Sequence, residues 1–190
     1  MRHFVYFSRH ARTSGNFKDL MKAGRMDIAI HVIINTFFLS HKKRGDVKLH
    51  LVFYGPPDPP KHIEMRIKSG LDISKKDVAG LIKRILYKFR KGKKTEVFPG
   101  CFVEKKSFLD IVEELAEEGN EIFVLDKRGE DIREVEMPKN SVFVLGDQDG
   151  LPKKEFKRLK KISTQISIGP ETYFASQTVT ILNNELDRRE

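Results

Sequence analysis

The chain is poor in cysteine and in long apolar runs. Its 190 residues contain one cysteine and no tryptophan, and the longest apolar stretch, 28–39, is about twelve residues and carries His31 and Asn35. The lone Cys101 excludes an internal disulfide and is typical of a reducing compartment. A membrane-spanning helix needs about twenty apolar residues. Because the first residues also lack a signal-peptide pattern, we expect a cytoplasmic protein without a membrane partner.

The sequence also lacks the glycine-rich motifs that bind phosphate groups. Neither G-x-x-x-x-G-K-[ST] nor G-x-G-x-x-G occurs. Instead, two apolar strands at 142–145 and 162–168 each run into a glycine-containing loop, at Gly146 and Gly169. In α/β proteins such loops lie at the carboxyl ends of parallel strands, where nucleotide-like ligands bind. The pattern favours a ligand with an adenosine but no phosphates, of which S-adenosylmethionine (SAM) is the commonest.

Positive charge is concentrated in the first half of the chain. The net charge is +9, and residues 61–94 alone hold twelve Lys or Arg against three acidic residues. Residues 1–50 add ten basic against three acidic residues, whereas residues 95–137 hold five basic against thirteen acidic. A lysine-rich solvated surface of the thermophile type is the alternative explanation. Since the basic residues are segregated, the pattern favours a surface for a nucleic acid.

Hydrophobic periodicity predicts an α/β fold in a single domain, residues 1–190. Helix start signals are Ser74 and Ser107, each followed three residues later by an acid. The predicted strands are 2–8, 46–55, 61–70, 122–126, 142–145 and 162–168, and the predicted helices are 26–41, 74–94, 107–120, 152–160 and 171–187. This alternation is typical of a mostly parallel sheet with helices on both faces.

Several segments, in order, resemble one known family. They read "ARTSGNF" at 11–17, "GRMDIAIHVIINTFFLSHKKRGDVKLHLVFYGPPDPP" at 24–60, "FVLGDQDG" at 143–150 and "SIGPETYFASQTVTILNNELDR" at 167–188. With them the chain resembles the SPOUT-class RNA methyltransferases, and within that class the archaeal tRNA pseudouridine-54 N1-methyltransferases. The resemblance spans nearly the whole chain.

This resemblance carries expectations about fold, cofactor and partners. It implies a trefoil knot in the C-terminal part, a homodimer, SAM as cofactor and the T-loop of tRNA as substrate. A basic RNA-facing part would cover about 1–94, and the knotted SAM-binding part about 120–190. The cofactor residues that it implies are Leu125, Gly146, Ile168, Gly169, Tyr173 and Thr178. At Thr178 the family pattern is expected to have cysteine, so a thiolate cannot act there in this chain.

The reaction implied is methylation of pseudouridine at N1, which needs a group that accepts or orients the N1 proton. Asp27 in "GRMD" is the candidate for that group. The candidate substrate-binding cations are Arg9, Arg12, Arg25, Lys83 and Arg84. From its position alone Asp27 is more often a helix cap or a partner of the helix dipole.

Other polar and aromatic residues have structural explanations. His31 on an apolar helix is expected in the core or at an interface, and Tyr173 and Phe174 are expected to pack. Asp147 and Asp149 lack the histidine or cysteine support of a metal site, so no metal is predicted. Cys101 is expected to be a buried small hydrophobe.

Two alternatives to the leading function stay open on the sequence. The first is a relative of the same fold that acts on another target, such as an rRNA pseudouridine or a ribose 2′-hydroxyl. The second is a non-catalytic RNA-binding or assembly factor, which only the departure at Thr178 favours.

Overall fold

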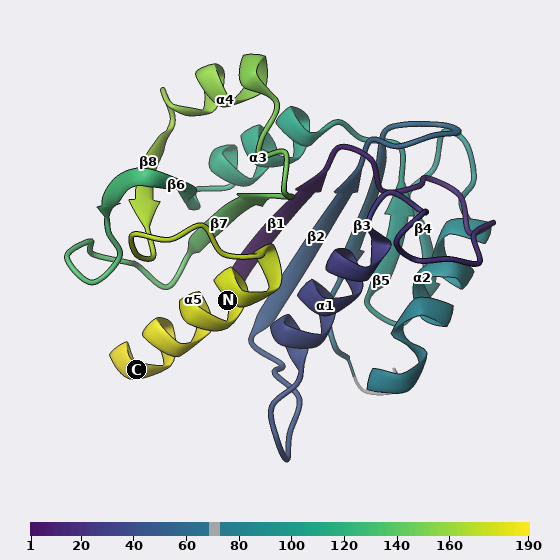
Figure 1. Ribbon diagram of the computed structural model, residues 1–190, viewed down its shortest axis with the longest axis horizontal. Helices are drawn as coiled ribbons and strands as arrows, with labels where there is room; N and C mark the ends of the chain where they lie inside the picture. Colours follow the sequence, from purple (N-terminus) through teal and green to yellow (C-terminus); the bar gives the residue numbers. More distant parts are fainter. Residues whose placement is uncertain (69–72) are drawn as a thin grey trace.

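The chain folds around one sheet of eight strands, in a computed structural model that describes residues 1–68 and 73–190 (Figure 1). In chain order the strands are β1 (Arg2–Ser8), β2 (Val47–Phe53), β3 (Lys61–Met65), β4 (Thr95–Phe98), β5 (Cys101–Glu104), β6 (Glu121–Asp131), β7 (Ser141–Gly146) and β8 (Ser163–Ser167). Their order across the sheet is β4-β5-β3-β2-β1-β7-β6-β8.

The central and C-terminal part of the sheet is parallel. β2, β1, β7, β6 and β8 pair in parallel, whereas β3, β5 and β4 are joined by antiparallel pairs. The predicted mostly parallel sheet is therefore confirmed, and β2 and β3 form an antiparallel pair. The five parallel strands end at one side of the sheet, which we call the carboxyl edge; the opposite side is the amino edge.

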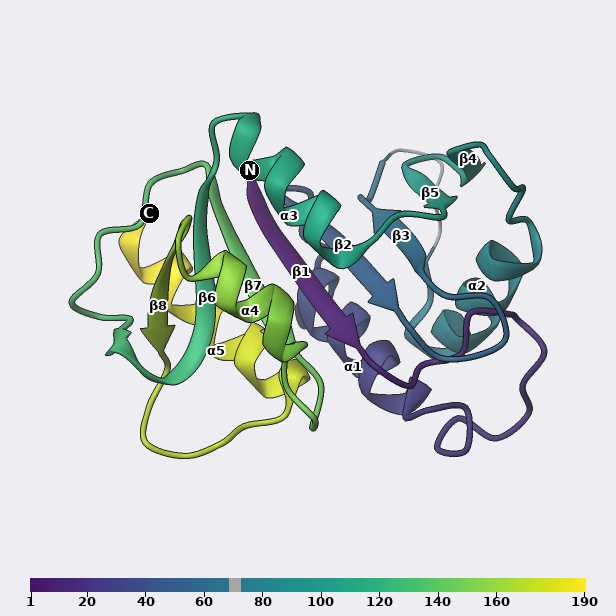
Figure 2. The same ribbon diagram turned by 90° about the horizontal axis from the view of Figure 1, so that it is seen from above.

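Helices cover both faces, as predicted. They are α1 (Met26–Phe37), α2 (Val78–Tyr87, preceded by the 3₁₀ turn Lys75–Asp77), α3 (Phe108–Glu117), α4 (Lys153–Leu159) and α5 (Ala175–Arg189). α1, α2 and α5 pack on one face and α3 and α4 on the other (Figures 1 and 2). None of the helices in the described ranges is both long and apolar enough to cross a membrane.

β1 shows why a strand in this position is apolar throughout. All seven of its residues are buried. Phe4 and Tyr6 point into the core beneath α1 and α5, while Val5 and Phe7 point into the core beneath α3. A strand between two helical layers has no solvent face, so it does not alternate with polar residues. Cys101 is buried as predicted, and burial raises the pKa of its thiol to about 12.

Several predicted ends were wrong. The helix predicted over 26–41 ends at Phe37, because Phe38 is extended and bridges to Lys43. The helix predicted over 74–94 ends at Tyr87, since beyond it the chain has little apolar surface to bury and turns at Gly92 (φ +75°).

The remaining differences concern strands and the last helix. The hairpin of β4 and β5 was not assigned from the sequence. The helix predicted over 171–187 begins only at Ala175, since the residues before it form a loop. The strand predicted over 61–70 ends at Met65, and its last two positions lie outside the described residues.

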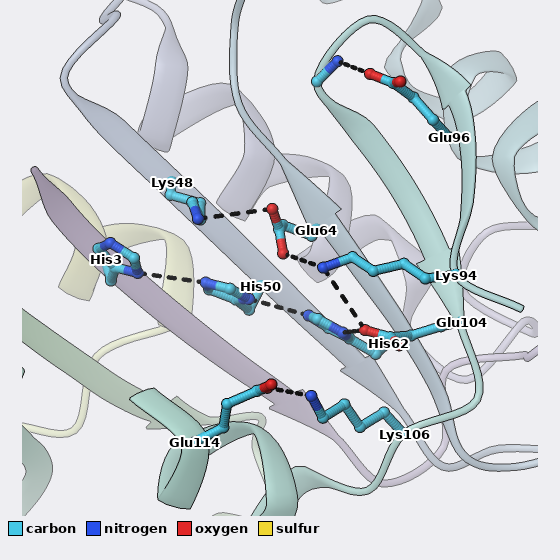
Figure 3. A network of polar contacts seen from close by, with 11 residues as sticks. His3, Lys48, His50, His62, Glu64, Lys94, Glu96, Glu104, Lys106 and Glu114 are labelled. Carbon is cyan, nitrogen blue, oxygen red and sulfur yellow. Dashed lines mark hydrogen bonds and ion pairs between the residues drawn. The ribbon is translucent and has the colours of Figure 1, made fainter. Parts of the chain in front are cut away.

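Three buried histidines form a chain across the sheet (Figure 3). Nδ1 of His3 lies 3.4 Å from Nε2 of His50, and Nδ1 of His50 lies 3.0 Å from Nε2 of His62. Nδ1 of His62 lies 2.9 Å from Oε1 of Glu104. The neighbouring rings are stacked, at 19° and 12° between planes. We call these four residues the histidine chain.

The carboxylate at its end fixes the direction of the hydrogen bonds. An ionised Glu104 can only accept, so His62 donates from Nδ1 and keeps Nε2 as an acceptor. His50 must then donate from Nδ1 to His62, and His3 from Nδ1 to His50. Burial lowers the pKa of all three imidazoles, that of His3 to about 4, so the three imidazoles are neutral at pH 7.

This arrangement predicts stability that depends on pH. Between about pH 6.5 and 4 the unfolded chain binds protons that the folded histidines do not, so stability is lost as the pH falls. Each histidine should contribute up to about 1.4 kcal/mol per pH unit to the slope of the unfolding free energy. Urea denaturation at several pH values across this range measures how the unfolding free energy depends on pH. The slope of that free energy against pH should be shallower for His50→Phe than for wild type. His41→Gln, which replaces an exposed histidine, is the control. Equal slopes for wild type and His50→Phe would contradict the assignment.

Candidate functional site

A cavity of about 170 Å³ opens at the carboxyl edge, beside the middle of β6, where β7 and β8 end and α5 begins. Its wall combines residues 125–127 of β6, the loops after β7 and β8, and the first turn of α5. The lining residues are Leu125, Asp126, Lys127, Leu145, Gly146, Asp147, Gly150, Leu151, Ile166, Ser167, Ile168, Gly169, Glu171, Thr172, Tyr173, Ala175 and Thr178. All six residues expected to bind the cofactor are among them, although they come from three separate segments.

Two glycines give this wall its shape. A Cβ at Gly146 would lie 2.6 Å from the backbone carbon of Gly150, closer than side chains approach backbone. The β7 loop therefore folds back on itself only because position 146 has no side chain. Gly169 has a φ of +144°, which disfavours residues with a side chain.

The charge of the cavity suits a cation better than a phosphate. Carboxylates of Asp126, Asp147 and Glu171 line it, against the single cation Lys127. Phosphate sites need the opposite balance, with backbone N–H groups and basic side chains. SAM, with its sulfonium and no phosphate, fits this donor set.

Thr178, where the family pattern is expected to have cysteine, lies on the cavity wall and is buried. Its hydroxyl donates to the carbonyl oxygen of Phe174 at 3.1 Å, so it is held by the first turn of its own helix. The side chain therefore shapes the wall, and its hydroxyl proton is already committed.

Asp147 ties the cavity to the central strand. Its Oδ2 accepts from the Ser8 hydroxyl at 3.1 Å and from the Arg9 N–H at 2.8 Å. Its Oδ1 accepts from the Asp149 N–H at 3.0 Å. This carboxylate, which the sequence suggested only as an unsupported metal ligand, instead joins the ends of β1 and β7. No sequence signal distinguishes this role.

Arg25 and Asp27 form a pair at the start of α1. The guanidinium donates to both carboxylate oxygens, each at 3.0 Å. Arg25 has left-handed backbone (φ 60°), and no side chain caps the helix, so Asp27 is not the cap. It remains an acid in the first turn, where the helix dipole favours it. The hydrogen bonds from Arg25 lower the pKa of Asp27, which is therefore ionised at neutral pH.

Tyr6 lies between this pair and the cavity, and sequence reasoning did not single it out. Its hydroxyl is fully buried and has no hydrogen-bond partner among the described residues. Burial raises the pKa of the Tyr6 phenol, and the charges of Asp147 and Asp27 raise it further. The carboxylates of Asp147, in the cavity, and Asp27, in α1, therefore both affect the pKa of the Tyr6 hydroxyl.

α1 and α5 are also bound to each other. The Asn35 amide donates to the Ser176 carbonyl at 3.0 Å, and the Asn183 amide donates to the Asn35 carbonyl at 3.4 Å. Both helices begin at the carboxyl edge. Asp27, in the first turn of α1, and the cavity thus lie on the same side of the sheet.

The other predicted cations lie outside the cavity. Lys83 stacks on the Phe17 ring, 4.9 Å from its centre, and Arg84 pairs with Asp77 at 2.7 Å. Arg9 and Arg12 lie in the loop that follows β1.

Two expectations about packing need correction. His31 is exposed, so a core position is wrong and an interface position stays a prediction. Tyr173 and Phe174 are exposed too, at 38% and 57%, because α5 starts after them and neither packs into the helix.

The sequence has relatives along its whole length. Residues 1–190 match the family described as "Putative SAM-dependent RNA methyltransferase". A protein of Thermococcus gammatolerans, named tRNA (pseudouridine(54)-N(1))-methyltransferase, is 35% identical over 197 residues, which cover 98% of this chain and 97% of that protein. One of Pyrococcus abyssi with the same name is also 35% identical, with 99% and 98% covered. The chain belongs to the tRNA (pseudouridine(54)-N(1))-methyltransferase family.

Solved structures support the fold of this methyltransferase family. The crystal structure of Archaeoglobus fulgidus Nep1 bound to S-adenosylhomocysteine has a TM-score of 0.62 at 12% identity and covers 98% of this chain and 97% of Nep1. The SpoU methyltransferase AviRb from Streptomyces viridochromogenes has a TM-score of 0.51 at 11% identity, with 99% and 59% covered. At such identities the likeness shows the fold alone, which is that of SPOUT methyltransferases.

The close approach at Gly146 predicts a sensitive position for this methyltransferase. Gly146→Ala should weaken SAM binding at least tenfold, because the new Cβ pushes the β7 loop away from the cavity wall. Isothermal titration calorimetry measures the effect. Gly45→Ala, where nothing lies within 4 Å of the new Cβ, is the matched control. If the two variants bind SAM alike, the β7 loop does not shape the cofactor site.

Proposed function

We propose that the protein transfers the methyl group of SAM to N1 of pseudouridine 54 in the T-loop of tRNA. Two observations together support this proposal. Residues 1–190 match the methyltransferase family, and one cavity brings together the six residues expected to bind the cofactor. A relative in Vibrio parahaemolyticus, 35% identical over 199 residues, is named "Putative pseudouridine methyltransferase". Pseudouridine as the target base is thus common to the names of these relatives.

The cavity residues would hold the cofactor through shape and backbone groups. Leu125, Gly146, Ile168 and Gly169 would offer backbone N–H and C=O groups to the adenosine, while Tyr173 and Thr178 close the wall. When bound there, SAM supplies an electrophilic methyl carbon. The carboxylates of the cavity would attract its positive sulfonium and exclude phosphorylated nucleotides.

Asp27 would orient the acceptor nitrogen. The methyl group would bond to N1 while N1 still carries its proton, as the S–C bond of SAM breaks to leave S-adenosylhomocysteine. Positive charge would therefore develop on N1 as the new bond forms. An ionised carboxylate that accepts the N1–H hydrogen bond stabilises that charge and aims the lone pair. Since its pairing with Arg25 lowers the pKa of Asp27, we favour orientation and charge stabilisation over full proton removal before transfer. The proton then leaves to water.

Substitution of Asp27 tests this role. Asp27→Asn should leave SAM affinity intact and lower single-turnover methyl transfer at least tenfold, because the amide keeps the shape but not the charge. Asp19→Asn, in the loop after β1, makes the same charge change and is the control. Asn35→Asp is unsuitable as a control, because the Asn35 side chain donates a hydrogen bond to α5. Unchanged transfer in Asp27→Asn would reduce Asp27 to a partner of the helix dipole.

The RNA would lie over the basic N-terminal part, about 1–94, and the cofactor in the part from about 120–190. Arg9, Arg12 and Arg25 would contact phosphates or base edges near the target, and Lys83 and Arg84 the RNA farther away. Planar guanidinium groups suit bidentate contacts with phosphate.

A second copy of the chain and a threaded C-terminal segment belong to the same proposal. Phe174 and Tyr173 are exposed beside the cavity, which is where a partner subunit would complete its wall. Sedimentation velocity tests the dimer directly: a single species of about 44 kDa supports it, twice the chain mass of 22.0 kDa. A 22.0 kDa species at micromolar concentration would contradict it.

Nucleoside mass spectrometry tests the reaction itself. A tRNA transcript with pseudouridine at position 54 should gain one methyl group on the base when incubated with protein and SAM. A uridine at the same position should stay unmodified, because its N1 is bonded to ribose and cannot accept a methyl group. A methyl group on ribose would reject the assignment in favour of 2′-O-methylation.

A further inference from the structure

The segment between α2 and β4 is an exposed turn rich in positive charge. Residues 88–94, which we call the basic turn, contain five Lys or Arg and no acid. All five are exposed: Lys88, Arg90, Lys91, Lys93 and Lys94. In the ranges 1–68 and 73–190, the side chains of the first four form no ion pair or hydrogen bond. Four unpaired cations in a short turn repel one another and favour a polyanionic partner.

Strand register places the basic turn at the carboxyl edge. Lys94 precedes β4, whose first residue, Thr95, pairs with Val103 near the end of β5. β5 ends at Glu104, which lies opposite His62 in β3. His62 lies opposite Val52, near the carboxyl end of β2. The turn therefore lies on the same side of the sheet as the cavity and the Arg25–Asp27 pair.

One end of the basic turn is anchored to the sheet (Figure 3). The Lys94 ammonium lies 2.8 Å from Glu64 and 3.9 Å from Glu104. Glu104 is held in turn by His62, and their hydrogen bond lowers the pKa of Glu104. The histidine chain thus fixes the carboxylate that Lys94 contacts. The remaining cations of the turn project from an anchored base.

A hollow of about 430 Å³ lies against the anchored end of the turn. It is lined by Lys91, Gly92, Lys93, Lys94, Glu104 and Lys105. No apolar side chain lines it, which disfavours an apolar ligand or a hydrophobic protein partner. Four ammonium groups around a polar hollow suit the phosphates of a nucleic-acid backbone.

The loop after β1 connects this turn to the acceptor site. At Gly15 a Cβ would lie 2.6 Å from both the Lys83 carbonyl oxygen and the Tyr87 ring, so the loop lies directly on the end of α2. Arg12 in the same loop has a buried Nε with no hydrogen-bond partner among the described residues. A cation with an unused donor therefore lies in the loop that joins β1 to the end of α2.

We propose that the double-stranded RNA next to the methylated nucleotide lies along the carboxyl edge, with its backbone on the basic turn. This inference rests on the proposed function and adds a second RNA contact to it. β1 and β4 are four strand spacings apart, so the turn lies about 19 Å from the acceptor site. An A-form RNA helix rises about 3 Å per base pair, so that distance corresponds to roughly six nucleotides of one strand. The basic turn therefore contacts the backbone of a stem and not the loop that holds the methylated nucleotide.

The test combines a charge reversal with a change in RNA length. Lys91→Glu/Lys93→Glu reverses two cations of the basic turn. Lys139→Glu/Lys161→Glu makes the same change in net charge at exposed positions of the amino edge, shortly before β7 and β8 and outside residues 1–94. Each protein is tested on a full-length pseudouridine-54 tRNA and on a hairpin with the same loop and a stem of three base pairs, which reaches only about 10 Å.

The basic-turn variant should lose at least tenfold in kcat/KM for full-length tRNA and little for the hairpin. Its binding to tRNA should become less dependent on salt, with a slope smaller by about two. The amino-edge control should match wild type on both RNAs. Unchanged SAM affinity by calorimetry shows that the variants are folded.

Other outcomes overturn the proposal. An equal loss in the amino-edge control would assign the effect to net charge. An equal loss on hairpin and tRNA would place the contact at the loop. If wild type methylates neither RNA, the proposed function fails, and the basic turn is tested by tRNA affinity alone. A tenfold loss of affinity confined to the basic-turn variant then supports the RNA contact. Equal affinities of the variants and wild type reject it.

Discussion

The parallel pairing of β1 with β7 is the constraint on which the rest of the molecule depends. It brings residues 2–8 beside residues 141–146 and aligns their carboxyl ends, so that the loops after both strands meet. Asp147 completes this junction through Ser8 and the Arg9 backbone. Because α1 follows the first strand and the loop that lines the cavity follows the second, one pairing places Asp27 and the cavity on the same side of the sheet.

Electrostatics divides the carboxyl edge into two regions. Carboxylates gather in the cavity, where they suit a cationic cofactor, and exposed cations gather on the basic turn, where they suit RNA. The cavity lies beside β7, β6 and β8, which are five to seven strand spacings from β4. The two regions are therefore about 24 to 34 Å apart, roughly three to four times the Debye length at physiological salt. The carboxylates of the cavity therefore act mainly on a ligand bound there, and the cations of the basic turn act mainly on RNA bound to the turn. The Arg25–Asp27 pair lies at the start of α1 and stays locally neutral.

The histidine chain shows how a polar element can be buried in a sheet. Its imidazoles remain neutral because burial opposes their charge, and each finds a hydrogen-bond partner on the next strand. The carboxylate of Glu104 orders every donor and acceptor in the row. The same carboxylate contacts Lys94, so an element that stabilises the fold also fixes the base of the basic turn.

The sequence by itself determined the strands around 2–8 and 142–145, the fold class and, through family resemblance, six of the residues that line the cavity. Those features follow from short apolar runs and local motifs. Only the tertiary structure decided the helix ends, the Arg25–Asp27 hydrogen bonds and the meeting of His3, His50 and His62. Helix ends depend on whether a turn finds a surface to bury against, as at Tyr87. The histidines meet because strand order and register, which arise from packing between distant segments, place them in one row.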